Sequence, residues 1–244
     1  MDIKFDGKRA LVTGAASGIG RGIALQLAKG GARVIALDVS EDQLIKLKEE
    51  IPSLETVAVD LSDWKATQET VKSVCPIDLL VNNAGLGEIL ALTQVTEENY
   101  NKIFNVNVKA LINVTKVVVE DLLNRESPGA IVNISSQASQ AALPNHTLYC
   151  ASKAAVDGFT RAVAMDYGPK KIRINAVNPT VVMTELGRRF WSDPALSQPM
   201  LAKIPLGRFG EISDVVAAVL FLLSDHASLI TGICFPVDGG FLAC

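Results

Sequence analysis

Tyr149 and Lys153 are four residues apart in a stretch, Leu148–Tyr167, whose apolar spacing predicts a helix. Residues four apart on a helix share one face, so the phenol and the ammonium are neighbours. A phenol ordinarily has a pKa of about 10, and a nearby positive charge stabilises the phenolate and lowers that value. The pair is a candidate for proton transfer at neutral pH, and an amphipathic surface contact is the alternative.

A serine pair precedes this tyrosine at the end of an apolar run, Ala130–Ile134, that reads as a strand. Ser136 stands 13 residues before Tyr149, and its hydroxyl could hold a substrate oxygen and stabilise charge that develops there. The adjacent Ser135 is the alternative. Strand geometry points two successive side chains to opposite faces, so only one of them can face the tyrosine.

Glycines 14, 18 and 20 form a Gly-x-x-x-Gly-x-Gly turn between the predicted strand Arg9–Thr13 and the predicted helix Gly18–Lys29. Glycine lacks Cβ, so the backbone can turn sharply and approach a pyrophosphate, which the helix N-terminus also favours. The turn therefore predicts a dinucleotide site. An ordinary glycine-rich turn is the alternative.

Asp38 closes the second predicted strand, 18 residues after Gly20. That spacing is close to the roughly 20 residues expected for a carboxylate that holds the ribose hydroxyls of a dinucleotide. A carboxylate there would repel the 2′-phosphate of NADP, and Ser17 and Val39 occupy positions where a base would help. We expect NAD as the cofactor, with NADP as the alternative. Asp38 could otherwise serve the start of the next helix.

Short apolar runs alternate with longer amphipathic stretches along the chain. The runs lack clean in/out alternation, which is typical of parallel strands buried on both faces. The expected strands are Arg9–Thr13, Arg33–Leu37, Thr56–Val59, Asp78–Val81, Ala130–Ile134, Ile172–Val177 and Ile233–Val237. The expected helices are Gly18–Lys29, Glu41–Glu50, Asp63–Ser73, Glu97–Arg125, Leu148–Tyr167 and Glu211–Leu223. This order predicts one α/β domain over residues 1–244, a doubly wound, seven-stranded parallel sheet with helices on both faces.

One stretch, Pro179–Arg208, breaks this alternation with four prolines and no obvious strand. A connection this long in a compact domain is usually functional. It follows the sixth strand, so it should lie above the carboxyl ends of the strands, where ligands bind in open α/β sheets. We interpret residues 180–208 as a substrate lid.

Composition excludes several classes of function. The chain has 23 basic and 26 acidic side chains, a net charge of −3, and a pI near 5.5, so we expect no nucleic-acid or anionic-membrane partner. Its strongest apolar run, Val215–Leu223, is too short to span a bilayer, and the N-terminal residues lack a secretory pattern. Four widely spaced cysteines predict free thiols, no metal site and a cytoplasmic protein.

Together, the motifs resemble the classical short-chain dehydrogenases/reductases over essentially the whole chain. The resemblance rests on Thr13–Gly20, Asn82–Gly85, Asn107, Ser136 and Tyr149–Lys153. It implies a Rossmann fold, a nicotinamide cofactor, a homotetramer and a catalytic group of Asn107, Ser136, Tyr149 and Lys153. In that group Asn107 takes part in a water-mediated proton relay through Lys153. A solvent-facing asparagine is the alternative for this position.

The resemblance also implies binding residues. Those expected at the cofactor are Gly14, Ser17, Gly18, Ile19, Gly20, Asp38, Asp60, Leu61, Asn83, Ala84, Gly85, Tyr149, Lys153, Pro179, Val182 and Thr184. Those expected at the substrate are Ser136, Gln137, Leu143, His146, Tyr149, Trp191 and Met200.

The sequence thus predicts an oxidoreductase that interconverts a small ketose or dicarbonyl with its polyol or alcohol. Two alternatives lie within the family: another polyol or alcohol dehydrogenase, and a 3-oxoacyl carrier reductase. A non-catalytic dinucleotide sensor is the alternative outside enzymes.

Overall fold

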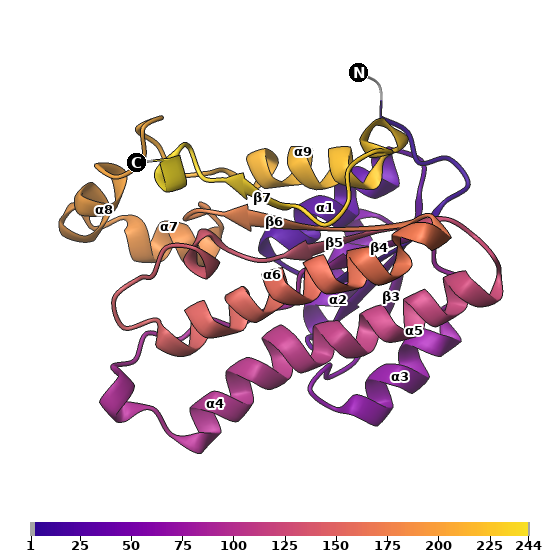
Figure 1. Cartoon of the computed structure of the whole chain (residues 1–244), viewed down its shortest axis with the longest axis horizontal. Helices are drawn as coiled ribbons and strands as arrows, with labels where there is room; N and C mark the ends of the chain where they lie inside the picture. Colours follow the sequence, from indigo (N-terminus) through magenta and orange to yellow (C-terminus); the bar gives the residue numbers. More distant parts are fainter. Residues whose placement is uncertain (1–2, 244) are drawn as a thin grey trace.

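A computed structural model describes residues 3–243, leaving aside the side chains of Leu186 and Phe190. Its strands form one parallel sheet in the order β3-β2-β1-β4-β5-β6-β7, which confirms the predicted single-domain, doubly wound architecture (Figure 1). The strands are β1 (Arg9–Thr13), β2 (Arg33–Asp38), β3 (Glu55–Ala58), β4 (Leu79–Asn82), β5 (Gly129–Ile134), β6 (Ile172–Pro179) and β7 (Cys234–Val237).

Helices cover both faces of the sheet (Figure 1). They are α1 (Gly18–Lys29), α2 (Glu41–Glu50), α3 (Trp64–Ser73), α4 (Glu97–Phe104), α5 (Leu111–Asn124), α6 (Thr147–Tyr167), α7 (Glu185–Trp191), α8 (Pro194–Leu201) and α9 (Ile212–Leu223). Successive side chains of each strand point to opposite faces of the sheet, so an apolar core forms on each face. Val12 of β1 packs into the core beneath α1 and α9, whereas Leu11 packs into the core beneath α5. Burial on both faces explains why the strand sequences are continuously apolar.

The strand order reverses at β1, because β2 lies on one side of it and β4 on the other. The connections that leave these strands therefore separate and open a crevice at the carboxyl ends, the usual ligand position in such sheets. The glycine turn after β1 and the Asn83–Gly85 segment after β4 both lie at this point. The topology thus places the two cofactor motifs side by side.

The helix predicted over Glu97–Arg125 is not continuous. A π-helical segment, η2 (Asn105–Ala110), separates α4 from α5. Wide turns of this kind are rare and often mark functional sites. Apolar periodicity could not reveal the break, because the chain stays helical on both sides of it.

The stretch after β6 contains two short helices, α7 and α8, that the sequence analysis did not predict. Thr184 and Asp193 cap them by accepting hydrogen bonds from main-chain N–H groups at 3.1 and 2.9 Å. Pro194 begins α8, a position where proline's missing N–H is harmless. Pro194, one of the prolines that suggested a loop, therefore begins a helix.

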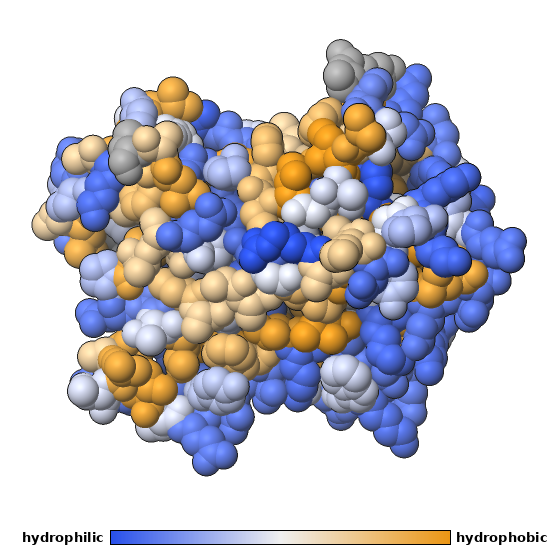
Figure 2. All heavy atoms as spheres, in the orientation of Figure 1, coloured by the Kyte–Doolittle hydropathy of each residue, from blue (hydrophilic) through white to orange (hydrophobic). Residues whose placement is uncertain are grey.

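The face formed by α5 and α6 carries an apolar band. Figure 2 shows hydrophobic side chains gathered across the middle of this view, over α6. The exposed apolar residues of α6 include Ala151, Ala154, Ala162 and Met165. Within residues 3–243 no helix is long and apolar enough to cross a membrane.

The cysteines were expected to be free thiols. Cys75, Cys150 and Cys234 are free, as predicted. Cys244, the fourth cysteine, lies outside the described residues.

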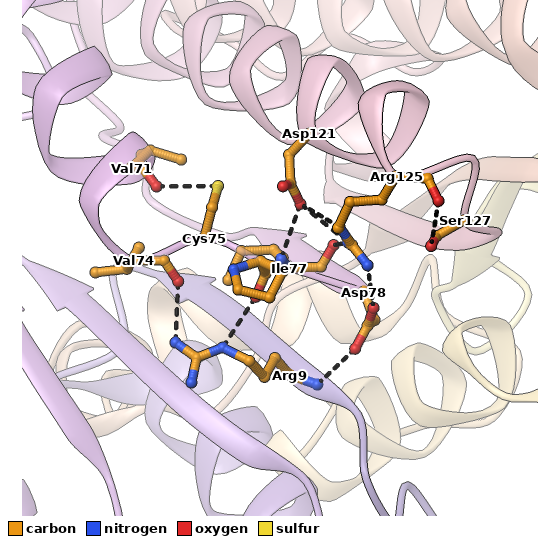
Figure 3. Close-up of polar contacts among 10 residues, drawn as sticks. Arg9, Val71, Val74, Cys75, Ile77, Asp78, Asp121, Arg125 and Ser127 are labelled. Carbon is orange, nitrogen blue, oxygen red and sulfur yellow. Dashed lines mark hydrogen bonds and ion pairs between the residues drawn. The ribbon is translucent and has the colours of Figure 1, made fainter.

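A polar network closes the opposite end of the sheet, where β1 and β4 begin (Figure 3). Asp121 of α5 accepts hydrogen bonds from the Ile77 N–H at 3.1 Å and from Arg125 at 2.9 Å. Arg125 also bonds to Asp78, whose other oxygen accepts the Arg9 N–H at 2.9 Å. The network anchors the loop before β4 to both β1 and α5. The network lies at the amino ends of the strands, whereas the crevice lies at their carboxyl ends.

Candidate active site

The crevice holds a cavity of about 1250 Å³ that runs from the glycine turn to α7. Its wall contains fifteen of the sixteen predicted cofactor residues: Gly14, Ser17, Gly18, Ile19, Asp38, Asp60, Leu61, Asn83, Ala84, Gly85, Tyr149, Lys153, Pro179, Val182 and Thr184. Gly20 packs behind the wall. Residues from five strand ends therefore meet at one site, as the resemblance implied.

The glycine turn is shaped by close packing. Gly14 and Gly18 have φ angles of +61° and +53°, a region that side chains with a Cβ rarely adopt. A Cβ at Gly20 would lie 2.1 Å from the Gly14 carbonyl oxygen. Asn83 donates its amide to that oxygen at 2.9 Å and to the Thr13 carbonyl at 3.0 Å. The turn therefore presents bare backbone at the start of α1, an arrangement that fits a pyrophosphate.

Asp38 contacts the start of α2 and also lines the cavity. Its carboxylate accepts hydrogen bonds from the Ala16 N–H at 3.0 Å and the Ser40 N–H at 3.1 Å, so it ties the glycine turn to the start of α2. It also lines the cavity beside Val39, which is 71% exposed. The carboxylate thus lies at the end of the crevice where a ribose would be held.

Tyr149, Ser136 and Lys153 come together on the cavity wall. The Ser136 hydroxyl lies on the same wall as the Tyr149 phenol and acts to lower its pKa. The Lys153 ammonium lies 5.7 Å from the centre of the tyrosine ring and donates to the Ile134 carbonyl at 2.8 Å. Ser135 turns away and donates to the Lys153 carbonyl at 3.1 Å. The geometry therefore selects Ser136 from the serine pair.

Burial controls the protonation of the pair. It raises the pKa of Tyr149, and the Ser136 hydroxyl acts in the opposite direction. Burial also lowers the pKa of Lys153 to about 8, against the effect of the Asp157 charge. The expected lowering of the tyrosine pKa by its lysine neighbour does not occur in the chain by itself. Desolvation of the phenolate is the largest influence on the Tyr149 pKa.

Asn107 is buried, which excludes the solvent-facing alternative. Its side-chain oxygen accepts the Leu86 N–H at 2.7 Å, and its amide donates to the Leu86 carbonyl at 2.8 Å and to Ser152 at 3.0 Å. Asn107 lies in the π-helical segment, so the wide turn sets its side chain against the loop after β4. It does not line the cavity directly.

The predicted substrate residues divide into two groups. Gln137, Leu143, His146 and Trp191 line the cavity together with Ser136 and Tyr149. Met200 does not; it is buried with Ile204 and Phe209 in a small core beside the segment after β6. Its apolar side chain packs beneath the cavity wall in this structure.

Several cavity residues escaped the sequence analysis. The wall also includes Leu86, Gly87, Glu88, Ile89, Lys102, Thr180 and Arg189. The segment Leu86–Ile89 follows β4 directly, so its place after a strand end was a usable signal. Lys102 and Arg189 lie in helices, where a single charged residue carries no such signal.

Comparisons with known proteins agree with this geometry. A family profile described as "Enoyl-(Acyl carrier protein) reductase" matches residues 14–242. L-xylulose reductase of Bos taurus is 52% identical over the whole of both chains. D-erythrulose reductase of Gallus gallus is 49% identical and covers 99% of this chain and 98% of its own. The crystal structure of a putative 2-deoxy-D-gluconate 3-dehydrogenase from Agrobacterium tumefaciens, with bound NADP, has a TM-score of 0.93 and 31% identity, covering 100% of this chain and 99% of its own.

The chain belongs to the short-chain dehydrogenase/reductase family. It is an oxidoreductase that uses a nicotinamide cofactor and acts on a small molecule.

Proposed function

We propose that this enzyme reduces L-xylulose to xylitol and also reduces α-dicarbonyls such as diacetyl. The observation that carries the proposal is the full-length similarity to L-xylulose reductase, at 52% identity, over a chain whose cavity brings Ser136, Tyr149 and Lys153 together. The similarity to D-erythrulose reductase supports a short ketose as the substrate class.

The proposed roles follow from the contacts. Tyr149 gives its proton to the carbonyl oxygen, and its raised pKa keeps the phenol protonated before the reaction. Ser136 holds the same oxygen and stabilises the charge on it. Lys153 holds the nicotinamide ribose and returns a proton to the phenolate, and Asn107 positions the loop and the water of that relay. A bound nicotinamide supplies the hydride.

The substrate end of the cavity suits a short, polar carbonyl. The Nδ1 atom of His146 lies 2.6 Å from the Pro144 carbonyl oxygen, so Nδ1 carries the hydrogen and Nε2 can accept from a sugar hydroxyl. Among the described residues, the buried Oε1 of Gln137 has no hydrogen-bond partner, so it can accept from a second hydroxyl. Trp191, at the end of α7, serves as the cover in a lid over residues 180–208. His146→Leu should raise KM for L-xylulose several-fold more than KM for diacetyl, because one hydrogen bond to a ligand hydroxyl contributes about 1 kcal/mol.

We further propose NAD(H) as the cofactor, with NADP(H) as the competing reading. The support is Asp38, whose charge lies at the cavity wall beside Ser17 and Val39, with no base at those two positions. The structural relative with bound NADP argues the other way.

Asp38→Ser should shift the ratio of kcat/KM for NADH to that for NADPH towards NADPH by at least about tenfold, since like charges across a few ångströms cost above 1 kcal/mol near a surface.

The first experiment compares initial rates with NADH and NADPH on L-xylulose, diacetyl and a 3-oxoacyl thioester. Turnover of the first two substrates with NADH preferred supports the proposal. NADPH preference would leave the substrate proposal standing and overturn the argument from Asp38. Turnover of the thioester alone would favour a carrier reductase, and binding of cofactor without turnover would favour the sensor.

We also propose that the enzyme is a cytoplasmic homotetramer. The apolar band over α6, where Met165 is 83% exposed, provides a surface for a second copy of the chain. Light scattering on the purified protein measures the assembly, and fractionation of the source cells measures the compartment. A monomer with this face exposed would contradict the proposal.

A further inference from the structure

Asp157 lies on α6 one helical turn beyond Lys153, and its side chain is 4% exposed. Burying a carboxylate is costly unless hydrogen bonds compensate the lost water. Its Oδ2 atom lies 2.6 Å from the Ser139 hydroxyl and 3.0 Å from the Asn178 amide nitrogen. Ser139 belongs to the short helix η3 (Gln137–Ser139) and Asn178 to β6. The carboxylate therefore joins three elements directly behind the active site.

The same two partners hold Ser136. The Asn178 amide nitrogen lies 3.1 Å from the Ser136 carbonyl oxygen, and the Ser139 hydroxyl lies 2.8 Å from it. The Ser136 hydroxyl accepts the Ala138 N–H at 3.1 Å and lines the cavity together with Tyr149. The position of the Ser136 main chain, and with it the direction of its hydroxyl, thus depends on groups that Asp157 orients.

The Asp157 charge also faces the lysine. Residues four apart on a helix are neighbours, so the carboxylate lies on the Lys153 side of α6 and opposes the effect of burial on the lysine pKa. Among the described α6 side chains, Tyr149 also lies beside Lys153, and Cys150 lies beside Tyr149. From β5, the group against the ammonium is the Ile134 carbonyl, which does not titrate.

We propose that Asp157 is a positioning residue of the active site, which holds Ser136 through Ser139 and Asn178 and thereby sets the position of the Ser136 hydroxyl beside Tyr149. The inference rests on the proposed function where it is measured through turnover. The placement of Ser136 is a property of the chain, and its effect on Tyr149 can be measured without a substrate.

The first test is a double-mutant cycle between Asp157→Ala and Ser136→Ala. Asp157→Ala should lower kcat/KM for diacetyl reduction at least about tenfold in the wild-type background and less than about threefold when Ser136 is already alanine, because coupled residues give non-additive losses. The dissociation constant for the cofactor should stay within about twofold. Additive losses in the cycle would show that Asp157 does not act through Ser136 and would overturn the proposal.

Two further variants control for misfolding and for the change in net charge. Asp157→Asn keeps the side-chain shape and one acceptor oxygen, so it should fold and show the same non-additivity with a smaller loss. Asp166→Asn removes an acid that is exposed on the same helix, and it should leave the rate and the cofactor affinity unchanged. An equal loss in Asp166→Asn would assign the effect to net charge and overturn the proposal.

The second test measures the ionisation of the Tyr149 phenol directly. With oxidised cofactor bound, the ultraviolet difference between each protein and its Tyr149→Phe counterpart reports the ionisation of Tyr149. The pKa of Tyr149 should rise in Asp157→Ala and in Ser136→Ala, and no further in the double variant, because each variant displaces or removes the Ser136 hydroxyl that lowers it. An unchanged titration in Asp157→Ala would overturn the inference. A wild-type protein inactive on every carbonyl tested would overturn the proposed function, while this titration would still decide the role of Asp157.

Discussion

Single residues set the protonation states on which reduction depends. Burial lowers the pKa of Lys153 from 10.5 to about 8, so the ammonium is present at neutral pH and is lost as the pH rises through about 8. The raised pKa of Tyr149 keeps the phenol protonated over that range. In this protein the lysine, and not the tyrosine, should therefore fix the alkaline limit of carbonyl reduction.

We expect kcat for reduction to be constant from about pH 6 to 7 and to fall above about pH 8, as the lysine loses its proton. Initial rates at saturating cofactor and substrate measure the profile. Lys153→Arg should have a lower rate without this limb, because a guanidinium does not titrate there. A wild-type rate that stays constant to about pH 9.5 would contradict the assignment.

Removal of the phenol hydroxyl tests the acid itself. Tyr149→Phe should lower kcat by about 10²–10⁴, the usual contribution of a positioned general acid. Cofactor fluorescence should show a dissociation constant within a few-fold of the wild-type value, since the ring still packs on the wall. A loss below tenfold would assign the proton to another group.

At the scale of elements, the glycine turn and α1 form one unit whose shape leaves no room for a side chain at Gly20. Its Cβ would lie 2.1 Å from the Gly14 oxygen and 2.4 Å from the Asn83 amide nitrogen, so the turn must shift. Gly20→Ala should weaken cofactor binding at least tenfold and lower the free energy of unfolding by about 1–3 kcal/mol, the usual cost of overpacking. Fluorescence titration and urea denaturation measure the two effects.

Gly158, in the middle of α6, is the matched control. Nothing lies within 4 Å of the Cβ that alanine would add there. Gly158→Ala should leave cofactor affinity unchanged and raise the free energy of unfolding by about 0.5–1 kcal/mol, because alanine is the better helix former. Equal weakening of cofactor binding in both variants would contradict the steric argument for Gly20.

At the scale of the whole molecule, the two ends of the sheet have separate tasks. The carboxyl ends hold the cavity, while the amino ends are closed by the network around Asp121, which is 17% exposed at its side chain. Asp121→Ala leaves the Ile77 N–H and one side of Arg125 without their acceptor. The free energy of unfolding should fall by about 2–3 kcal/mol, typical of lost bonds to a charged group, with kcat unchanged.

Urea denaturation and steady-state rates measure this separation. Glu69→Gln removes an exposed partner of Lys65 on α3 and should change stability by less than about 1 kcal/mol. A tenfold fall in kcat for Asp121→Ala would show that the two ends of the sheet are coupled.

Most of the framework was predictable because it follows from local pattern. The buried strands are continuously apolar, and every predicted strand is present within a few residues of its observed bounds. The glycine turn, Asp38 and the pair Tyr149 and Lys153, which were selected by spacing together with the family resemblance, line one cavity. Helices α7 and α8 were missed, because short capped helices among several prolines look like a loop.

The sequence by itself determined the fold class, since apolar periodicity is a local pattern along the chain. The family followed from the resemblance of its motifs to known ones, and these motifs also gave the residue types at the site. Only the tertiary structure decided which serine faces Tyr149, where Met200 packs and how Asp157 reaches Ser136. Those outcomes depend on contacts between elements distant in sequence and on burial. Burial also decided the pKa of Lys153, because the loss of water around a charge is a property of the folded chain.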